Sequence, residues 1–149
     1  SHDVSRFLSL CGGDTASYRL AFLFMMCFVG MPTIFYGDEL GVQGIREEEY
    51  RAPMPWKGGD MALSGFFRKA IAMRHALSPL RDGTFQMLSA EEGSRVIRFR
   101  RDTGAASVTV AINVGETDAA VPPSEEKLYW AEGLQNGILS PGGFSVTYR

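Results

Sequence analysis

The feature that most constrains the fold is an apolar segment near the start of the chain, which changes from helical to extended character at a glycine and a proline. Residues 16–29 carry apolar side chains on nearly every helical face, so a helix here has to be buried. Gly30 and Pro32 end it, and residues 33–36 form a short run of β-branched and aromatic residues. A buried helix, a tight turn and an apolar strand are typical of a parallel α/β sheet.

A long polar segment and a second helix follow. Residues 38–60 are rich in glycine, proline and charge, which predicts a loop, and long loops are commonly functional. Asp14 and Thr15 are suited to cap the first helix, and Asp60 is suited to cap the second. The second helix is predicted to end at Pro79, and its apolar residues recur at helical spacing: Leu63, Phe66, Phe67, Ala70, Ile71, Met73 and Leu77.

After Pro79 the pattern changes to short β-rich runs separated by turns. The runs cover residues 84–88, 95–101, 107–113, 127–130 and 144–148. Turns are expected at Glu92-Gly93, Thr103-Gly104, Asn136-Gly137 and residues 141–143. This pattern predicts a separate antiparallel domain of the sandwich type.

Composition and charge exclude several classes of partner. The chain has 149 residues, 45% of them hydrophobic, and a formal net charge of −2, which indicates an ordered globular protein without an electrostatic footprint for nucleic acid or an anionic membrane. The cluster Arg95, Arg98, Arg100 and Arg101 alternates with apolar residues and is typical of a half-solvated sheet. The most apolar stretch, residues 20–36, is shorter than the roughly 20 residues that span a bilayer.

Cysteine and histidine spacing argues against a metal site. Cys11 and Cys27 form no C-x-x-C pair, and His2 and His75 are far apart. Cys27 sits in an apolar run, as a small buried hydrophobe does. The two cysteines favour a reducing compartment, and we expect an intracellular or cell-associated protein, with the cytoplasm as the first candidate. The acidic run at residues 47–49 lacks the alternating ligand spacing of a calcium loop, so we expect no cofactor.

Polar residues cluster at three places where an α/β active site would gather them. Side chains that follow a parallel strand and precede its helix face the substrate. The groups at residues 1–3, 37–39 and 51–56 meet this criterion and are expected to share one rim. Each group alone also has a structural interpretation, since Asp38-Glu39 is suited to start a helix and Trp56 to fill a core.

The ordered combination of these motifs resembles the end of an α-amylase family barrel. The motifs are Ser-His-Asp-Val-Ser-Arg-Phe-Leu at residues 1–8, Gly-Met-Pro-Thr-Ile-Phe-Tyr-Gly-Asp-Glu-Leu-Gly at 30–41 and Arg-Ala-Pro-Met-Pro-Trp at 51–56. They are similar above all to the neopullulanase, cyclomaltodextrinase and maltogenic amylase group. The resemblance implies the last two βα units of a (β/α)8 TIM barrel at residues 1–79, followed by an antiparallel β-sandwich at residues 80–149. A whole barrel needs roughly 250 residues.

The resemblance also implies roles for individual residues. Asp3 matches the aspartate that binds two adjacent hydroxyls of the glucose at the cleavage subsite and stabilises the flattened, oxocarbenium-like transition state. His2 matches the histidine that hydrogen-bonds the same ring. Arg51 matches an arginine near that subsite, and Arg6 fits a buried structural ion pair as well as a substrate contact. The nucleophile and the general acid of the family come from earlier strands, so this chain is expected to contain neither.

These observations predict part of a retaining α-glucan hydrolase, inactive as an isolated chain. The expected substrates are maltooligosaccharides, cyclodextrins or pullulan, with α-1,4 and, as a second option, α-1,6 bonds. The expected protein partner is the missing part of the barrel. The alternative is a non-catalytic module that binds carbohydrate or associates with itself, because apolar residues on the two helices need covering: Phe24, Phe28, Phe66 and Phe67.

Overall fold

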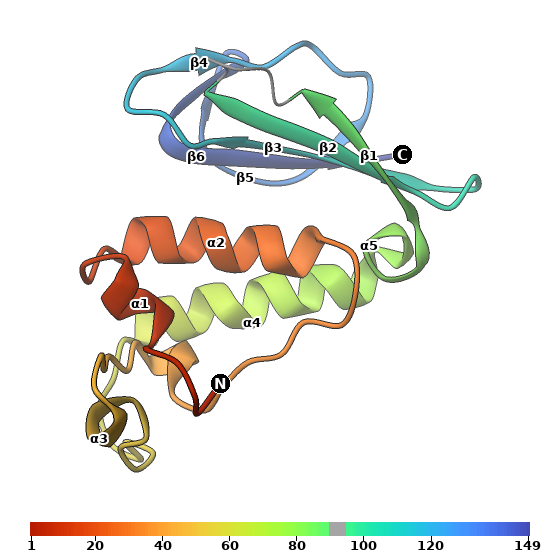
Figure 1. Cartoon of the computed structure of the whole chain (residues 1–149). Coiled ribbons are helices and arrows are strands. Elements are labelled where there is room, and N and C mark those ends of the chain that lie inside the picture. Colours follow the sequence, from red (N-terminus) through yellow and green to blue (C-terminus); the bar gives the residue numbers. More distant parts are fainter. Residues whose placement is uncertain (90–94) are drawn as a thin grey trace. The chain divides into compact units, whose positions relative to one another are not determined.

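The computed structural model of the chain describes residues 1–89 and 95–149, and its chain path is drawn in Figure 1. These residues form two compact units. One comprises Ser1–Met26 and Met31–Met73, and the other comprises Cys27–Gly30 and Arg74–Arg149. The expected turn at Glu92-Gly93 lies outside the described residues, and the domain boundary at residue 79 stays a prediction.

The first unit is helical. Its elements are α1 (Phe7–Leu10), most of α2 (Thr15–Cys27), the 3-10 helix η1 (Asp38–Leu40), α3 (Glu47–Tyr50) and most of α4 (Met61–Ala76). Helices α2 and α4 lie side by side in Figure 1 and pack through stacked rings of Phe22 and Phe67, whose centroids are 3.5 Å apart. The core of this unit is therefore the interface between the two long helices that the sequence predicted.

Both predicted N-caps are confirmed. The Asp14 carboxylate accepts a hydrogen bond from the Ala16 N–H at 2.9 Å, and Asp60 accepts one from the Leu63 N–H at 2.9 Å. These bonds satisfy N–H groups that have no partner within a helix, which is why the helices start where they do. The predicted end at Pro79 is wrong: α4 ends at Ala76, and Pro79 lies in the first turn of α5 (Ser78–Asp82), where its missing N–H costs nothing.

Residues 33–36 do not form the predicted strand. No strand of the described residues pairs with them. A strand exists through hydrogen bonds to a neighbour, so an apolar, β-branched segment without a neighbour stays irregular. The aromatic rings of Phe35 and Tyr36 instead lie against the guanidinium of Arg6, with centroids 4.1 and 4.9 Å from its carbon.

The second unit contains α5 and one curled antiparallel sheet of six strands, visible in Figure 1. The strands are β1 (Thr84–Ser89), β2 (Val96–Asp102), β3 (Ser107–Asn113), β4 (Ala119–Ala120), β5 (Lys127–Gln135) and β6 (Ile138–Tyr148). Their order is β1-β2-β3-β6-β4, and β5 pairs with β6 as well. The antiparallel pairing is as predicted, but one ladder joins all described strands into a single curled sheet, so the predicted sandwich is not confirmed.

Of two expected turns, the one at Asn136-Gly137 is present and the one at residues 141–143 is not. Asn136 and Gly137 connect β5 to β6 with φ angles of 48° and 77°, as a two-residue hairpin requires. The expected turn at residues 141–143 is wrong, because these residues lie inside β6. In the pairing of β6 with β5, Phe144 lies opposite Glu132 and Leu139 lies opposite Leu134, so residues 140–143 form a bulge opposite Gly133. Pro141 falls in this bulge, where its missing N–H breaks no bond between the two strands.

Each face of the sheet has its own apolar cluster. One face carries Phe99, Val110 and Val146, all fully buried. The other carries a smaller cluster of Val96, Ala111 and Leu139, with Ala119, Val121 and Leu134 packed against it. Arg101 lies on the first face and is 1% exposed, so the predicted half-solvated position is wrong for this arginine.

Arg101 is buried because it serves as a hydrogen-bond donor to the backbone. Its guanidinium donates to five carbonyl oxygens at 2.8 to 3.2 Å, those of Cys27, Phe28, Leu80, Gly83 and Thr84. Three of these belong to the ends of α2 and α5 or directly follow them, where carbonyls lack partners within the helix.

Burial also raises the pKa of the Cys27 thiol to about 12, consistent with the predicted role as a small hydrophobe.

Within the described ranges, every helix is either too short or too polar to cross a bilayer.

Candidate functional site

The structure brings the three predicted site residues together, although 49 residues separate His2 from Arg51. The Arg51 Nε–H donates to the backbone carbonyl of His2 at 2.8 Å, and Arg51 Nη2 lies 3.6 Å from Asp3 Oδ1. His2 Nε2 lies 3.0 Å from the same Asp3 oxygen. The side chains of His2 and Asp3 are 66% and 63% exposed, so an imidazole, a carboxylate and a guanidinium face solvent at one place.

Helix α3 holds Arg51 from the other side. Arg51 Nη1 lies 2.5 Å from Glu47 Oε1, four residues earlier, so the guanidinium bridges Glu47 and Asp3. Glu47 was not expected as a neighbour of the site. Its spacing of four residues from Arg51 was the available signal, because such residues meet on one helical face.

The other two glutamates of α3 pair with Arg46. Glu48 and Glu49 both form ion pairs with its guanidinium, at 3.3 and 2.5 Å. The Glu49 carboxylate also accepts the N–H groups of Ile45 and Arg46, and these bonds lower its pKa to about 2. In the part of the chain that the structure describes, no group of three histidine, cysteine or acidic side chains could hold a metal ion.

Arg6 ties the segment that carries His2 and Asp3 to the loop that carries Arg51. It is 2% exposed and donates to the Tyr36 carbonyl at 2.7 Å, the Tyr50 carbonyl at 3.0 Å and the Asp38 carboxylate at 3.0 Å. Burial raises the pKa of Asp38, and the hydrogen bond from Arg6 opposes that shift. The structural ion pair that the sequence left open for Arg6 is confirmed.

A close backbone approach completes this attachment. Gly44 N–H donates to Ser9 Oγ at 2.8 Å, and the Gly44 carbonyl accepts the Arg6 N–H at 2.8 Å. A Cβ at position 44 would lie 2.5 Å from the Tyr50 nitrogen, so only glycine fits between α1 and α3 here. The sequence analysis did not identify Gly44 or Ser9, since neither belongs to a recognisable motif.

Two aromatic residues of the motifs have different surroundings. Tyr36 donates its hydroxyl to the Ala52 carbonyl at 2.9 Å and thereby fixes the backbone next to Arg51. Trp56 is 88% exposed, so the interpretation that it fills a core is wrong for this chain. Its indole is free to line a site rather than a core.

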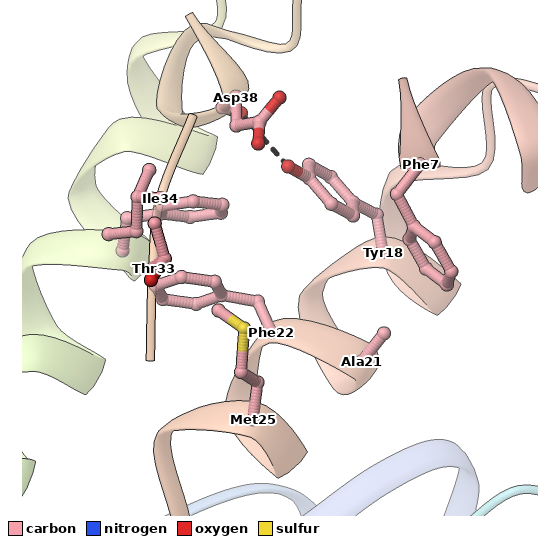
Figure 2. A pocket seen from close by; sticks show the side chains of 9 residues that line it. Phe7, Tyr18, Ala21, Phe22, Met25, Thr33, Ile34 and Asp38 are labelled. Carbon is pink, nitrogen blue, oxygen red and sulfur yellow. Dashed lines mark hydrogen bonds between the residues drawn. The ribbon is translucent and has the colours of Figure 1, made fainter. Parts of the chain in front are cut away.

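An apolar pocket of about 340 Å³ opens in the same unit, and Figure 2 shows it from close by. Phe22 and Met25 of α2 and Phe7 of α1 line it together with Thr33 and Ile34, which belong to the segment that does not pair as a strand. The Tyr18 hydroxyl donates to the backbone carbonyl of Asp38 at 3.4 Å, the dashed contact in Figure 2. The pocket thus lies between these helices and a segment that pairs with no strand of the described residues.

Comparison with known proteins identifies the family. Residues 1–77 match the family model described as alpha amylase, catalytic domain. Neopullulanase 2 of Thermoactinomyces vulgaris is 38% identical over 115 residues, which are 76% of this chain and 20% of that protein. A cyclomaltodextrinase of Geobacillus thermopakistaniensis is 33% identical over 140 residues, 92% of this chain and 24% of the relative.

Solved structures agree with these relatives. The debranching enzyme of Nostoc punctiforme is 28% identical, with a TM-score of 0.85, over 99% of this chain and 34% of the solved one. A cyclomaltodextrinase structure is 29% identical with a TM-score of 0.80, over 99% of this chain and 28% of the solved one. The match therefore extends over both units, while the chain spans only a fifth to a third of these proteins. The chain belongs to the α-amylase family of glycoside hydrolases.

Proposed function

We propose that this chain is part of an enzyme that hydrolyses α-glucans, with maltooligosaccharides, cyclodextrins or pullulan as substrates and α-1,4 bonds as the first candidate for cleavage. The names of its relatives support this substrate class, since they include a neopullulanase, cyclomaltodextrinases and an amylopullulanase. Cleavage of α-1,6 bonds is the second candidate.

The observation that carries this proposal is the convergence of His2, Asp3 and Arg51 on one exposed rim. In our proposal Asp3 accepts hydrogen bonds from two adjacent hydroxyls of the glucosyl ring. A carboxylate suits this task because it has two acceptor oxygens and forms charge-assisted bonds. These bonds tighten as the ring flattens toward the oxocarbenium-like transition state, and so lower the barrier. His2 and Arg51 donate to the same sugar.

We further propose a retaining mechanism whose nucleophile and general acid lie outside this chain. Such a mechanism needs two carboxyl groups about 5 to 5.5 Å apart. We assign neither role to Glu39 or to Glu48, and Glu48 pairs with Arg46 at 3.3 Å. The relatives, of which this chain matches about a fifth, leave ample length for both groups.

We propose that, in the whole enzyme, residues 1–79 form the last two βα units of a (β/α)8 barrel. Residues 33–36 would then become a strand when a neighbouring strand supplies hydrogen bonds. The apolar pocket beside Thr33 and Ile34 supports this, because a neighbouring strand of the barrel would fill it. The same pocket also favours the second candidate, a module that covers its apolar side by self-association.

The activity of the isolated chain and of a graft tests the proposal. The purified 149-residue chain is expected to leave maltotriose intact. The graft is neopullulanase 2 of Thermoactinomyces vulgaris in which residues 1–77 of this chain replace the segment that aligns with them. It is expected to hydrolyse pullulan. NMR of the first product is expected to show that the α configuration is retained. Turnover by the isolated chain, or a folded graft without activity, contradicts the proposal.

Sedimentation separates the second candidate from the first. An isolated chain that forms a defined dimer, with the dimer lost in a Met25→Glu variant that charges the half-buried pocket wall, supports self-association. A monomer at the same concentration removes that candidate and leaves the missing barrel segments as the partner of the pocket.

A further inference from the structure

A second pocket lies on the sheet, in the unit that does not carry His2, Asp3 and Arg51. It has a volume of about 220 Å³ and opens on the face of Arg98, Ala111 and Ser145, which are neighbours across β2, β3 and β6. The segment that precedes β5 forms one wall through Val121, Pro122 and Pro123. The pocket is thus built from the curl of the sheet and from a rigid segment that crosses it.

The walls and the polar groups of this pocket are separate. Pro122, Pro123, Leu128 and Leu134 supply apolar surface. Four polar residues lie on strands, namely Arg98, Thr109, Ser145 and Thr147, and Glu126 directly precedes β5. A small number of oriented polar groups in an apolar concavity is the usual composition of a site for a small molecule.

The carboxylate of Glu126 is held in place by two hydroxyl groups. Thr109 Oγ1 donates to Glu126 Oε1 at 3.1 Å, and Thr147 Oγ1 donates to Glu126 Oε2 at 2.6 Å. Each carboxylate oxygen has more than one acceptor site, so both remain able to accept a further hydrogen bond. The carboxylate is therefore a fixed acceptor at the pocket.

Arg98 is a donor without an acceptor. Its Nε–H is buried, and no described residue accepts a hydrogen bond from it. Among the ion pairs of the described residues, none joins Arg98 to Glu126 or to another acid within 4.0 Å. A buried N–H without an acceptor is costly. A ligand oxygen within reach of Arg98 Nε would relieve that cost.

We propose that this pocket binds one glucosyl unit of an α-glucan, as a site separate from the one around Asp3. Arg98 and Glu126 together are neutral, which favours an uncharged ligand that both accepts and donates. Neighbouring hydroxyls of a pyranose ring do both, whereas a phosphate accepts only. The C–H face of the ring packs on Pro122 and Pro123. The choice of a glucan over other polyols rests on the proposed function.

Titration of the chain with maltotriose, followed through backbone amide NMR signals, tests this site. We expect shifts at residue 98, residues 121–128 and residues 145–147, with a dissociation constant on the order of 1 mM. Arg98→Met keeps the apolar stem and removes the donors, and is expected to weaken binding about tenfold or more. Arg100→Met is the matched control, because Arg100 lies on the same strand and pairs instead with Asp102 and Ser107.

A second variant covers the case in which Arg98→Met does not fold. Thr147→Val preserves the shape of the side chain and releases one oxygen of Glu126, so it is expected to weaken binding without unfolding the sheet. No shift at the pocket, an equal response to glycerol at the same hydroxyl concentration, or unchanged binding in both variants overturns the proposal.

The same spectra separate this proposal from the proposed function. Asp3→Asn is expected to leave the shifts at the sheet pocket unchanged, because the two sites share no residue. Shifts confined to residues 1–6 and 46–56 would leave the glucan site around Asp3 standing and remove the one on the sheet.

Discussion

Two arginines of the first unit show how burial decides what a charge does. Arg6 is 2% exposed, and its guanidinium is enclosed by two carbonyls, one carboxylate and two aromatic rings. Arg51 is 45% exposed and bridges two exposed carboxylates, those of Asp3 and Glu47. Exposed ion pairs contribute little to stability, whereas a buried ion left without its partner is costly. Arg6 therefore holds the site together, and Arg51 is free to act in it.

Replacement of these arginines separates the two roles. Arg6→Met is expected to lower the free energy of unfolding by about 3 kcal/mol, because Asp38 loses its partner. Arg51→Met is expected to lower it by less than about 1 kcal/mol. Urea denaturation of both variants measures the difference, and equal losses would show that Arg6 does not have the structural role described.

At the scale of single residues, the sequence predicted those whose function is local. The caps Asp14 and Asp60 were recognisable because a cap acts on the next few residues. The burial of Arg101 was not recognisable in the sequence. The alternating pattern of the strand does not indicate which of its arginines lies near the end of α2. The proximity of Arg51 to Asp3 was expected because side chains at the strand ends of an α/β active site share one rim, and the family resemblance pointed to the same pair.

Among the elements, α2 is held at both ends by side chains. Asp14 accepts N–H groups at its start, and Arg101 donates to the Cys27 and Phe28 carbonyls at its end. Its apolar middle packs on α4 through Phe22. The end contacts are needed because an apolar helix has no polar surface of its own to satisfy the first and last backbone groups.

The cap at Asp14 predicts a pH dependence. Hydrogen bonds from Ser17 and from the Ala16 and Ser17 N–H groups lower the pKa of Asp14 in the folded chain. A lowered folded pKa means that the cap stabilises the fold above the unfolded value and that this stabilisation is lost as pH falls through the folded value. Asp14→Ala should therefore lower the melting temperature at pH 7 and leave it nearly unchanged in strong acid. A difference of the same size at both pH values contradicts a role for the ionised cap.

Arg101 predicts a loss of stability in the sheet unit. Arg101→Met leaves five backbone carbonyls without their donor and is expected to lower the free energy of unfolding by about 3 kcal/mol. The matched control is Arg100→Met on the same strand, where exposure to water makes the loss less than about 1 kcal/mol. Denaturation curves with equal midpoints would contradict the account of Arg101.

The strands illustrate which elements a sequence can predict. Residues 107–113 form β3 as predicted, and the Asn136-Gly137 turn is confirmed, because alternation and a two-residue hairpin are local signals. Residues 33–36 have an equally strong local signal but form no strand, since a strand depends on a neighbour. The single curled sheet was missed for a related reason: whether two groups of strands share one ladder depends on β6, which is long enough to pair with β3, β4 and β5.

For the whole molecule, the family assignment and the geometry lead to the same account. A family model covers residues 1–77, the three predicted site residues meet on one rim, and an apolar pocket remains beside an unpaired segment. We infer that the pocket and the unpaired segment mark where the missing part of the barrel packs. The rim alone binds sugar in this account, and chemistry requires the carboxylates of the missing part.

The most direct measurement of this claim is the turnover number of the neopullulanase 2 graft with Asp3 replaced by Asn. A group that stabilises the transition state is expected to lower kcat by about 10²- to 10³-fold when it is removed, with the fold retained. Glu48→Gln in the same graft is the control, because this exposed side chain pairs with Arg46 and not with Asp3 or Arg51 among the described residues, and it should leave kcat unchanged. If the Asp3→Asn graft turns over pullulan as fast as the unmodified graft, Asp3 does not stabilise the transition state and the account is wrong.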